Sequence, residues 1–170
     1  MSLNDDHQKD YLAILKKLQG VKSWRDRARI CYPRVSLHPP VLPGALAEAE
    51  DKLGITLPEE LKEIYAESDG VFMNTGANTI MPLEDMIAEN LDLRDRDQYE
   101  DLYMPFDNLL FFGRAGNGDL WAFGIKANGK IDTLNLYGWD HETDARPWIA
   151  RDIFDLFVRI GCGSLYDAST

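Results

Sequence analysis

The sequence predicts a single α+β domain in which an antiparallel-rich central sheet is packed by about four helices. Two Asn-Gly pairs, at 117–118 and 128–129, separate three apolar runs, which is the pattern of a meander of hairpins. Segments with helical spacing come mainly before this region, and helices followed by strands favour α+β over a parallel βαβ sheet. The chain has 170 residues, a length that fits one domain, and we expect that domain to span residues 1–170.

The pattern of apolar residues, glycine and prolines in the N-terminal part predicts one helix followed by an irregular connection. Over residues 5–18 apolar side chains recur at helical spacing, and Gly20 suits the end of the helix. Four prolines from Pro33 to Pro43 exclude a long helix there and suit a connection over the surface. We therefore expect residues 1–40 to contribute a helix and a proline-containing connection.

Two further helices are expected before the meander. The first covers residues 44–53, where apolar residues recur at three and four positions, and Gly54 ends it. The second starts near Pro58, which suits a first helical turn, and closes at Asp69-Gly70. The chain then turns toward the sheet at Val71-Phe72.

The meander is expected from Asn108 to Tyr137, with a last helix at about 147–160 after a polar turn at 140–146. Both faces of the middle strand are apolar, so that strand should be central, and its bulkier face should meet the helices. We expect one shared core, formed by Leu61, Ile64, Tyr65, Trp121, Phe123, Phe154 and Phe157.

Charge is concentrated in two stretches of opposite sign. Lys and Arg number 18 against 29 Asp and Glu, a net charge of −11 that repels nucleic acid and anionic membranes at long range. Residues 84–107 hold nine acids and two arginines and contribute −7, whereas residues 16–34 hold seven basic residues and one acid. A basic protein is the complementary partner. The alternative is that each stretch is only a solvated helix face.

The apolar runs, the N-terminal residues and the two cysteines together predict the cellular compartment. No apolar run reaches the roughly 18 residues that span a bilayer, and the start MSLNDDHQKD has neither a basic nor an apolar leader region. Cys31 and Cys162 form no CxxC pair, and buried free thiols are favoured over the alternative, a disulfide. We expect a cytoplasmic protein that makes no contact with membranes.

Motifs for catalysis, metals and cofactors are weak. The glycines of GRAGNG at 113–118 lead into a strand, so a hairpin turn is favoured over a phosphate-binding loop. None of the three histidines belongs to an HxxxH or HExxH pair, and no GxSxG elbow occurs. Asp140, His141 and Glu142 offer a base or metal ligands, but adjacent residues rarely converge on one ion. We expect no catalytic residue, metal or cofactor. An enzyme stays the alternative if these side chains meet another polar group in a cleft.

The four tryptophans have two interpretations. Trp24, Trp121, Trp139 and Trp148 are either buried core residues, the commoner role, or parts of a binding platform. Because Trp139 adjoins the polar turn, it is the one we expect outside the core.

A series of short motifs follows in a recognisable order. They are LGITLPEEL at 53–61, IY at 64–65, DG at 69–70, LLFF at 109–112, GDLWAF at 118–123, YGWDHE at 137–142 and IARDIFDLF at 149–157. In this order, over about residues 41–157, the sequence resembles the SUKH superfamily, which includes fungal cell-wall-synthesis regulators and bacterial immunity proteins. Ile153 stands where the closing helix usually has serine, and the acidic residues 91–103 do not map onto the family pattern.

The resemblance implies a compact α+β domain that binds a cognate toxin, often a nuclease, and it implies no active site. We therefore expect a non-catalytic protein-binding module, an immunity protein that neutralises a basic toxin domain. The alternative is a regulatory or scaffold protein that binds endogenous partners. The expected partner-binding residues are Asp92, Asp95, Asp97, Glu100, Asp101, Trp139, Asp140, His141 and Glu142.

Overall fold

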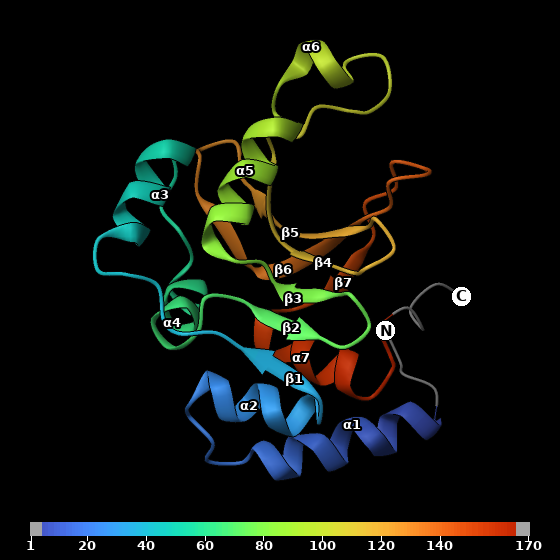
Figure 1. The fold of residues 1–170 in the computed structure, drawn as a ribbon. Helices are drawn as coiled ribbons and strands as arrows, with labels where there is room; N and C mark the ends of the chain where they lie inside the picture. Colours follow the sequence, from blue (N-terminus) through green and yellow to red (C-terminus); the bar gives the residue numbers. More distant parts are fainter. Residues whose placement is uncertain (1–4, 166–170) are drawn as a thin grey trace.

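In the computed structural model, which describes residues 5–165 apart from the side chains of Asp5 and Arg96, seven strands form one antiparallel sheet with seven helices around it (Figure 1). The strands are β1 (Val35–Leu37), β2 (Val71–Met73), β3 (Asn78–Ile80), β4 (Leu109–Arg114), β5 (Leu120–Ile125), β6 (Ile131–Trp139) and β7 (Trp148–Ala150). The helices are α1 (Asp5–Leu18), α2 (Trp24–Cys31), α3 (Ala45–Leu53), α4 (Glu59–Glu67), α5 (Leu83–Leu93), α6 (Arg96–Tyr99) and α7 (Ile153–Gly161). The α+β class and the antiparallel sheet are confirmed.

The meander β4–β6 forms the middle of the sheet, as predicted. Each strand pairs with its neighbour along the chain, and the two Asn-Gly pairs make the β4–β5 and β5–β6 hairpins. Gly118 and Gly129 have φ values of 107° and 77°, which explains the glycine at each tip. Both faces of β5 are covered, since Leu120, Trp121, Ala122 and Phe123 are all buried.

A layer of helices bridges the two edges of the sheet. Helix α2 contacts β1 at one edge, α7 contacts β7 at the other, and the two helices pack on each other. Phe157 of α7 joins them, with ring centroids 5.6 Å from Trp24 and 5.3 Å from Tyr32. This pair and the sheet enclose part of the core, to which α3, α4 and α5 also contribute buried side chains.

The predicted core is confirmed except for Phe154. The other six residues of the expected set are buried in one cluster, whereas Phe154 is only half-buried and packs against that cluster from outside. The guanidinium carbon of Arg27 lies 5.2 Å from the centre of the Phe154 ring. Phe154 faces α2 across a partly solvated boundary because the inward side of α7 is taken by Phe157.

The expected helix at 147–160 is wrong in its first part. Residues 148–150 form β7, which pairs with β6 through Trp148 and Ala150. Asp152 is the N-cap of α7, and its Oδ1 accepts the N–H of Asp155 at 2.7 Å. Residues 148–150 form a strand because they pair with β6, and this contact joins residues that are not near neighbours in the sequence.

The acidic stretch 84–107 contributes a helix that packs into the fold. Its first part is α5, whose buried side chains include Met86, Asn90 and Leu93. Asn90 donates to the carbonyl oxygen of Phe111 at 2.7 Å and accepts its N–H at 2.9 Å. This side chain therefore takes the place of a neighbouring strand along part of β4.

Three helices, α2, α5 and α6, add to the four expected. The basic stretch belongs partly to α2, which starts at the N-cap Ser23 and buries Trp24, Ala28 and Cys31. The proline-containing connection includes an unexpected edge strand, β1, paired with β2.

Cys31 and Cys162 are both buried free thiols. No helix of residues 5–165 is both long and apolar enough to cross a membrane.

Candidate functional site

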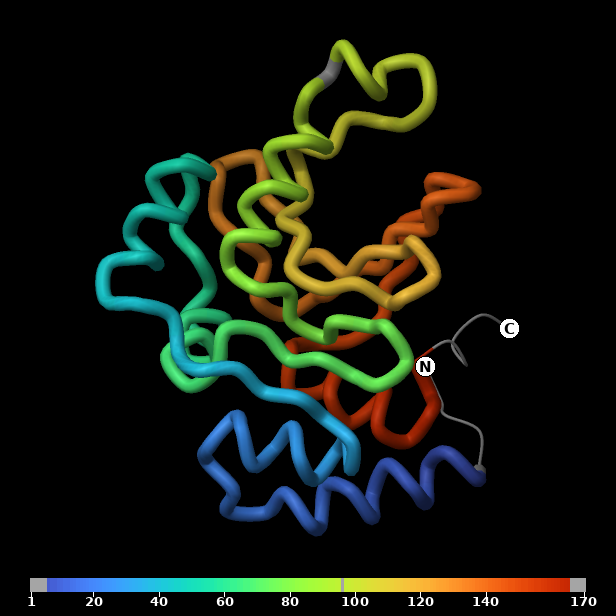
Figure 2. The backbone as a smooth tube through the Cα atoms, viewed as in Figure 1, coloured from blue at the N-terminus to red at the C-terminus, as the bar shows by residue number. Residues whose placement is uncertain are grey.

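The predicted acidic residues lie at the end of the molecule opposite α1 and α2 (Figures 1 and 2). Asp92 is on the last turn of α5, and the others lie in residues 94–107, which we call the acidic loop. The five carboxylates are all on exposed residues: Asp92, Asp95, Asp97, Glu100 and Asp101. Asp92 also accepts the hydroxyl of Tyr99 at 2.8 Å, which ties α6 to α5.

The acidic loop is held by a pair of residues in the turn between β6 and β7, which we call the β6–β7 turn (residues 140–147). Asp144 accepts the N–H of Met104 through Oδ2 and the indole N–H of Trp139 through Oδ1, both at 2.8 Å. Arg146 donates to the carbonyl oxygens of Met104 at 2.7 Å and Pro105 at 3.0 Å, and pairs with Asp144 at 3.2 Å. Two distant segments are thereby joined.

Trp139 lies in the core, so the expectation that it stands outside is wrong. It is 5% exposed, and its ring meets Tyr103 and Phe106 edge-on with centroids 5.1 Å apart in each case. Phe111 completes the cluster at 5.9 Å. Trp139 therefore supports the acidic loop from beneath and offers no indole surface to a partner.

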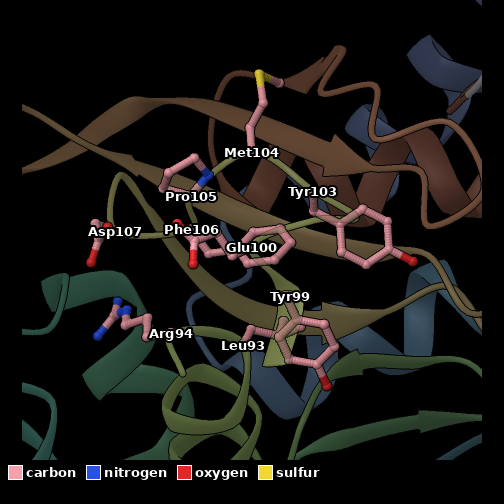
Figure 3. Close-up of a pocket in the computed structure, with 9 residues that line it drawn as sticks. All are labelled: Leu93, Arg94, Tyr99, Glu100, Tyr103, Met104, Pro105, Phe106 and Asp107. Carbon is pink, nitrogen blue, oxygen red and sulfur yellow. The ribbon is translucent and has the colours of Figure 1, made fainter. Parts of the chain in front are cut away.

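A cavity of about 120 Å³ opens under the acidic loop (Figure 3). The residues that line it are Leu93, Arg94, Tyr99, Glu100, Tyr103, Met104, Pro105, Phe106 and Asp107. Arg94 donates to the carbonyl oxygen of Leu109 at 3.0 Å, so its head group is anchored to the sheet. Next to the cavity, Leu102 and Met104 are 67% and 56% exposed. The loop thus combines aromatic walls, exposed apolar side chains and carboxylates.

His141 does not point freely into solvent. Its Nδ1 lies 2.9 Å from Oδ1 of Asp119, at the tip of the β4–β5 hairpin, and its backbone N–H donates to the same oxygen at 3.3 Å. The Asp119 carboxylate raises the pKa of His141 above its ordinary value. Gly118 gives the ring room, since a Cβ there would lie 2.8 Å from the imidazole. The hairpin tip and the β6–β7 turn are thus locked together.

Asp140 stands beside this pair. Its Oδ1 accepts the N–H groups of Glu142 and Thr143 at 2.9 and 3.1 Å, and hydrogen bonds from Thr143 and Glu142 lower its pKa. Ligand atoms of Asp119, Asp140 and His141 lie within 4.8 Å of one another, so these three would be the donors for a cation. Glu142 is exposed and is not part of this group.

The structure brings the two predicted acidic regions together. The hydroxyl of Tyr103 donates to the carbonyl oxygen of His141 at 3.1 Å, so the acidic loop continues into the β6–β7 turn. Sequence reasoning missed Asp119, Asp144 and Arg146, which organise this surface. The sequence signals for Asp119 are its place directly after the predicted Asn-Gly tip and within the GDLWAF motif.

The condition set for the alternative of an enzyme is met in part, since His141 pairs with Asp119 and the Asp140 carboxylate lies beside them. Asp119 and Asp140 line a cavity whose other walls are Asn117, Trp121, Gly138, Trp139, Ala145, Pro147 and Ile149. Among the residues described, neither a serine nor a cysteine lines this cavity. The pair holds the β6–β7 turn against the tip of the β4–β5 hairpin.

A comparison with protein families identifies the fold. The SUKH_6 family model, described as SMI1-KNR4 cell-wall, matches residues 44–157, about two thirds of the chain. Among curated proteins, the comparison finds no match. The match begins at α3 and ends within α7, so it includes the whole meander, the acidic loop and the β6–β7 turn. The chain therefore belongs to the SMI1-KNR4 (SUKH) family.

Proposed function

We propose that this protein is a non-catalytic protein-binding module, an immunity protein that neutralises a cognate toxin domain by direct binding. The observation that carries the proposal is the acidic loop. It presents exposed carboxylates and exposed apolar side chains around a cavity lined by Tyr99 and Tyr103. Membership of the SUKH family supports it, since that family comprises mainly binding proteins that include immunity proteins and cell-wall regulators.

The composition of this surface suits recognition of a protein. Binding energy in protein interfaces is concentrated in a few residues that fill or line central pockets, tyrosine among them, with a polar rim around them. In the acidic loop, the cavity between Tyr99, Tyr103 and Phe106 is the candidate pocket, and Glu100 and Asp107 stand at its border (Figure 3). A side chain of the partner that enters this pocket would lose contact with water. The partner residues next to it would face the carboxylates.

The sign of the charge specifies the kind of partner. The whole chain carries −11, and the stretch 84–107 contributes −7 of it. Such a field attracts a basic protein, such as a nuclease with a basic groove, and raises the rate of association. The same field repels nucleic acid, so a protein and not the nuclease's own substrate is the proposed partner.

The two buried free thiols support the cytoplasm as the proposed compartment.

A regulatory or scaffold role is the second candidate. The description of the matching family as SMI1-KNR4 cell-wall favours it. The same acidic loop would then bind an endogenous basic protein, and the physical account of the surface would not change. The two candidates differ in whether the partner is toxic.

Co-expression with a toxin encoded beside the gene tests the proposal. We expect the wild-type chain to restore growth of cells that express the toxin domain, and to form a complex with it in size-exclusion chromatography. Growth arrest in spite of the co-expressed chain, without a complex, would refute the immunity role. Rescue by a chain in which Tyr103 and Met104 are replaced by Asp would show that the acidic loop is not the interface.

A further inference from the structure

A second cavity lies between the β4–β5 hairpin tip and the β6–β7 turn. Its volume is about 330 Å³, and its walls include Trp121, Ile149 and Pro147. Two carboxylates, Asp119 and Asp140, also line it. Of the described residues, none that lines it is a lysine or an arginine. The cavity thus combines apolar walls with two carboxylates, of which Asp119 is paired with His141 and Asp140 accepts backbone N–H groups.

These carboxylates are fixed in place before any ligand arrives. Asp119 is held through Oδ1 by His141 and through Oδ2 by the side-chain amide of Asn117 at 2.9 Å. Asp140 is held through Oδ1 by two backbone N–H groups of its own turn. The hydrogen bonds from Thr143 and Glu142 lower the pKa of Asp140 and so favour its ionised form. A cation that enters would therefore meet acceptors that need little rearrangement.

We propose that this cavity binds the side chain of a lysine or arginine of the partner protein. The aliphatic stem would pack on the exposed side chains of Ala145 and Pro147 at the mouth of the cavity, and the charged head would bind the carboxylates of Asp119 and Asp140. Long basic side chains commonly bury their stems against apolar surface while the charged head stays in a polar environment. The inference rests on the proposed protein-binding function and names the chemistry of one contact within it.

Charge complementarity decides between a basic occupant and an apolar one. An apolar side chain in this cavity would exclude water from Asp119 and Asp140 without pairing them, which is unfavourable. A cation pairs them through charge-assisted hydrogen bonds. The cavity also continues the proposed interface, because Tyr103 of the acidic loop is hydrogen-bonded to His141, whose ring lies against Asp119. One basic partner can therefore reach both places.

Peptide titration of the full chain tests this site without the partner. Three peptides, acetyl-Gly-Ser-X-Ser-Gly-amide with X lysine, arginine or norleucine, are added to the ¹⁵N-labelled protein. We expect the lysine and arginine peptides to shift the backbone amides of Gly138 and Ala145. Norleucine has a similar unbranched stem without the charge and should leave them in place. Shifts of equal size with norleucine would contradict the proposal.

Variants locate the binding within the cavity. Asp140→Asn keeps the size of the side chain and should weaken the lysine peptide about tenfold, the effect of losing one charged hydrogen-bond partner. Asp51→Asn removes an exposed charge on α3, outside the cavity, and should leave affinity unchanged. Ala145→Phe fills the cavity without altering either carboxylate and should abolish the shifts. Unaltered lysine binding by Asp140→Asn or by Ala145→Phe would overturn the assignment.

Two further outcomes also count against it. If Zn²⁺ or Ca²⁺ alone shifts these amides and neither basic peptide does, the three donors form a metal site and the proposal is wrong. If no probe causes a shift, the cavity is not a binding site for a basic side chain. Both results leave the protein-binding function standing, because co-expression with the toxin tests that function separately.

Discussion

At the scale of single residues, two phenylalanines of α7 that look alike in the sequence have different surroundings. Phe157 is 1% exposed between Trp24 and Tyr32, whereas Phe154 is half-buried beneath Arg27. We predict that Phe157→Ala lowers the free energy of unfolding by about 3–5 kcal/mol, because it leaves a cavity in the core. Phe154→Ala should lower it by only about 1–2 kcal/mol, because water already reaches that ring.

Denaturant unfolding of both variants measures this difference. Equal losses would show that α7 packs with another face toward α2. The sequence pattern treats both residues as members of one apolar stripe, since positions three apart lie on the same side of a helix. Only the position of α2 distinguishes them.

Glu60 gives a pH dependence at the same scale. Its carboxylate accepts the N–H groups of Ile153 and Phe154 at 3.0 and 3.1 Å, at the start of α7. Burial nevertheless raises the pKa of Glu60 from 4.5 to about 7, against the opposing effect of these N–H donors. The folded state therefore holds this proton more tightly than the unfolded state. The stability that the protonated form contributes is present below pH 4.5 and is lost as the pH rises through 7.

We predict that the Glu60→Gln variant does not lose stability in this way, because glutamine cannot ionise. The free energy of unfolding of the variant should rise relative to wild type between pH 4.5 and pH 7, by roughly 2 kcal/mol in total. Urea titrations at several pH values measure it. Glu59→Gln, an exposed neighbour on α4, is the control and should follow the wild-type curve. A constant difference between Glu60→Gln and wild type would mean that the pKa of Glu60 is not raised.

At the scale of elements, Asn90 joins α5 to β4. Its side chain pairs with both the N–H and the carbonyl oxygen of Phe111 and is 1% exposed. We predict that Asn90→Leu lowers the free energy of unfolding by about 2–4 kcal/mol, because two buried backbone groups lose their partner. The amide hydrogen of Phe111 should also exchange faster with solvent.

The control is Leu91→Ala on the exposed side of the same helix, where Leu91 is 47% exposed. This change should alter stability by under about 0.5 kcal/mol and leave exchange at Phe111 unchanged. Slow exchange at Phe111 in Asn90→Leu would show that another group covers this edge of β4. The acidic stretch thus has two parts, a helix that packs on the sheet and a loop whose carboxylates are exposed.

At the scale of the whole molecule, the distribution of charge gives a prediction about binding kinetics. Neutralising the five acids Asp92, Asp95, Asp97, Glu100 and Asp101 to Asn or Gln should slow association with the cognate toxin. The melting temperature should stay nearly unchanged, because exposed charges contribute little to stability. The on-rate of the wild type should fall as salt rises to ~0.15 M, where the Debye length is about 8 Å.

A matched variant separates local from overall charge. Neutralising Asp6, Asp10, Glu48, Asp51 and Glu59 changes the net charge equally, but these exposed residues lie on α1, α3 and α4. We expect this variant to bind with nearly the wild-type on-rate in surface plasmon resonance. If both variants slow association equally, net charge and not the acidic loop steers the partner. If neither does, the interface lies elsewhere.

Local preferences explain which parts of the fold could be predicted. Helices α3 and α4 were expected within one or two residues, because Gly54 and Pro58 end and begin helices through their own backbone geometry. The hairpins at Asn117-Gly118 and Asn128-Gly129 follow from the positive φ that glycine tolerates. The SUKH resemblance depends on the same motifs, which is why the family could be identified from them.

The sequence by itself therefore determined the class of fold, the meander, the family and the excess of negative charge, because each depends on residue types or on contacts between near neighbours. Only the tertiary structure decided that residues 148–150 are a strand, that Trp139 is buried, and that Asp119 holds His141. It also decided that Asp144 and Arg146 fasten the acidic loop to the β6–β7 turn. These contacts join segments up to some 40 residues apart, and no local preference specifies such a pairing, because it depends on how the sheet and helices pack.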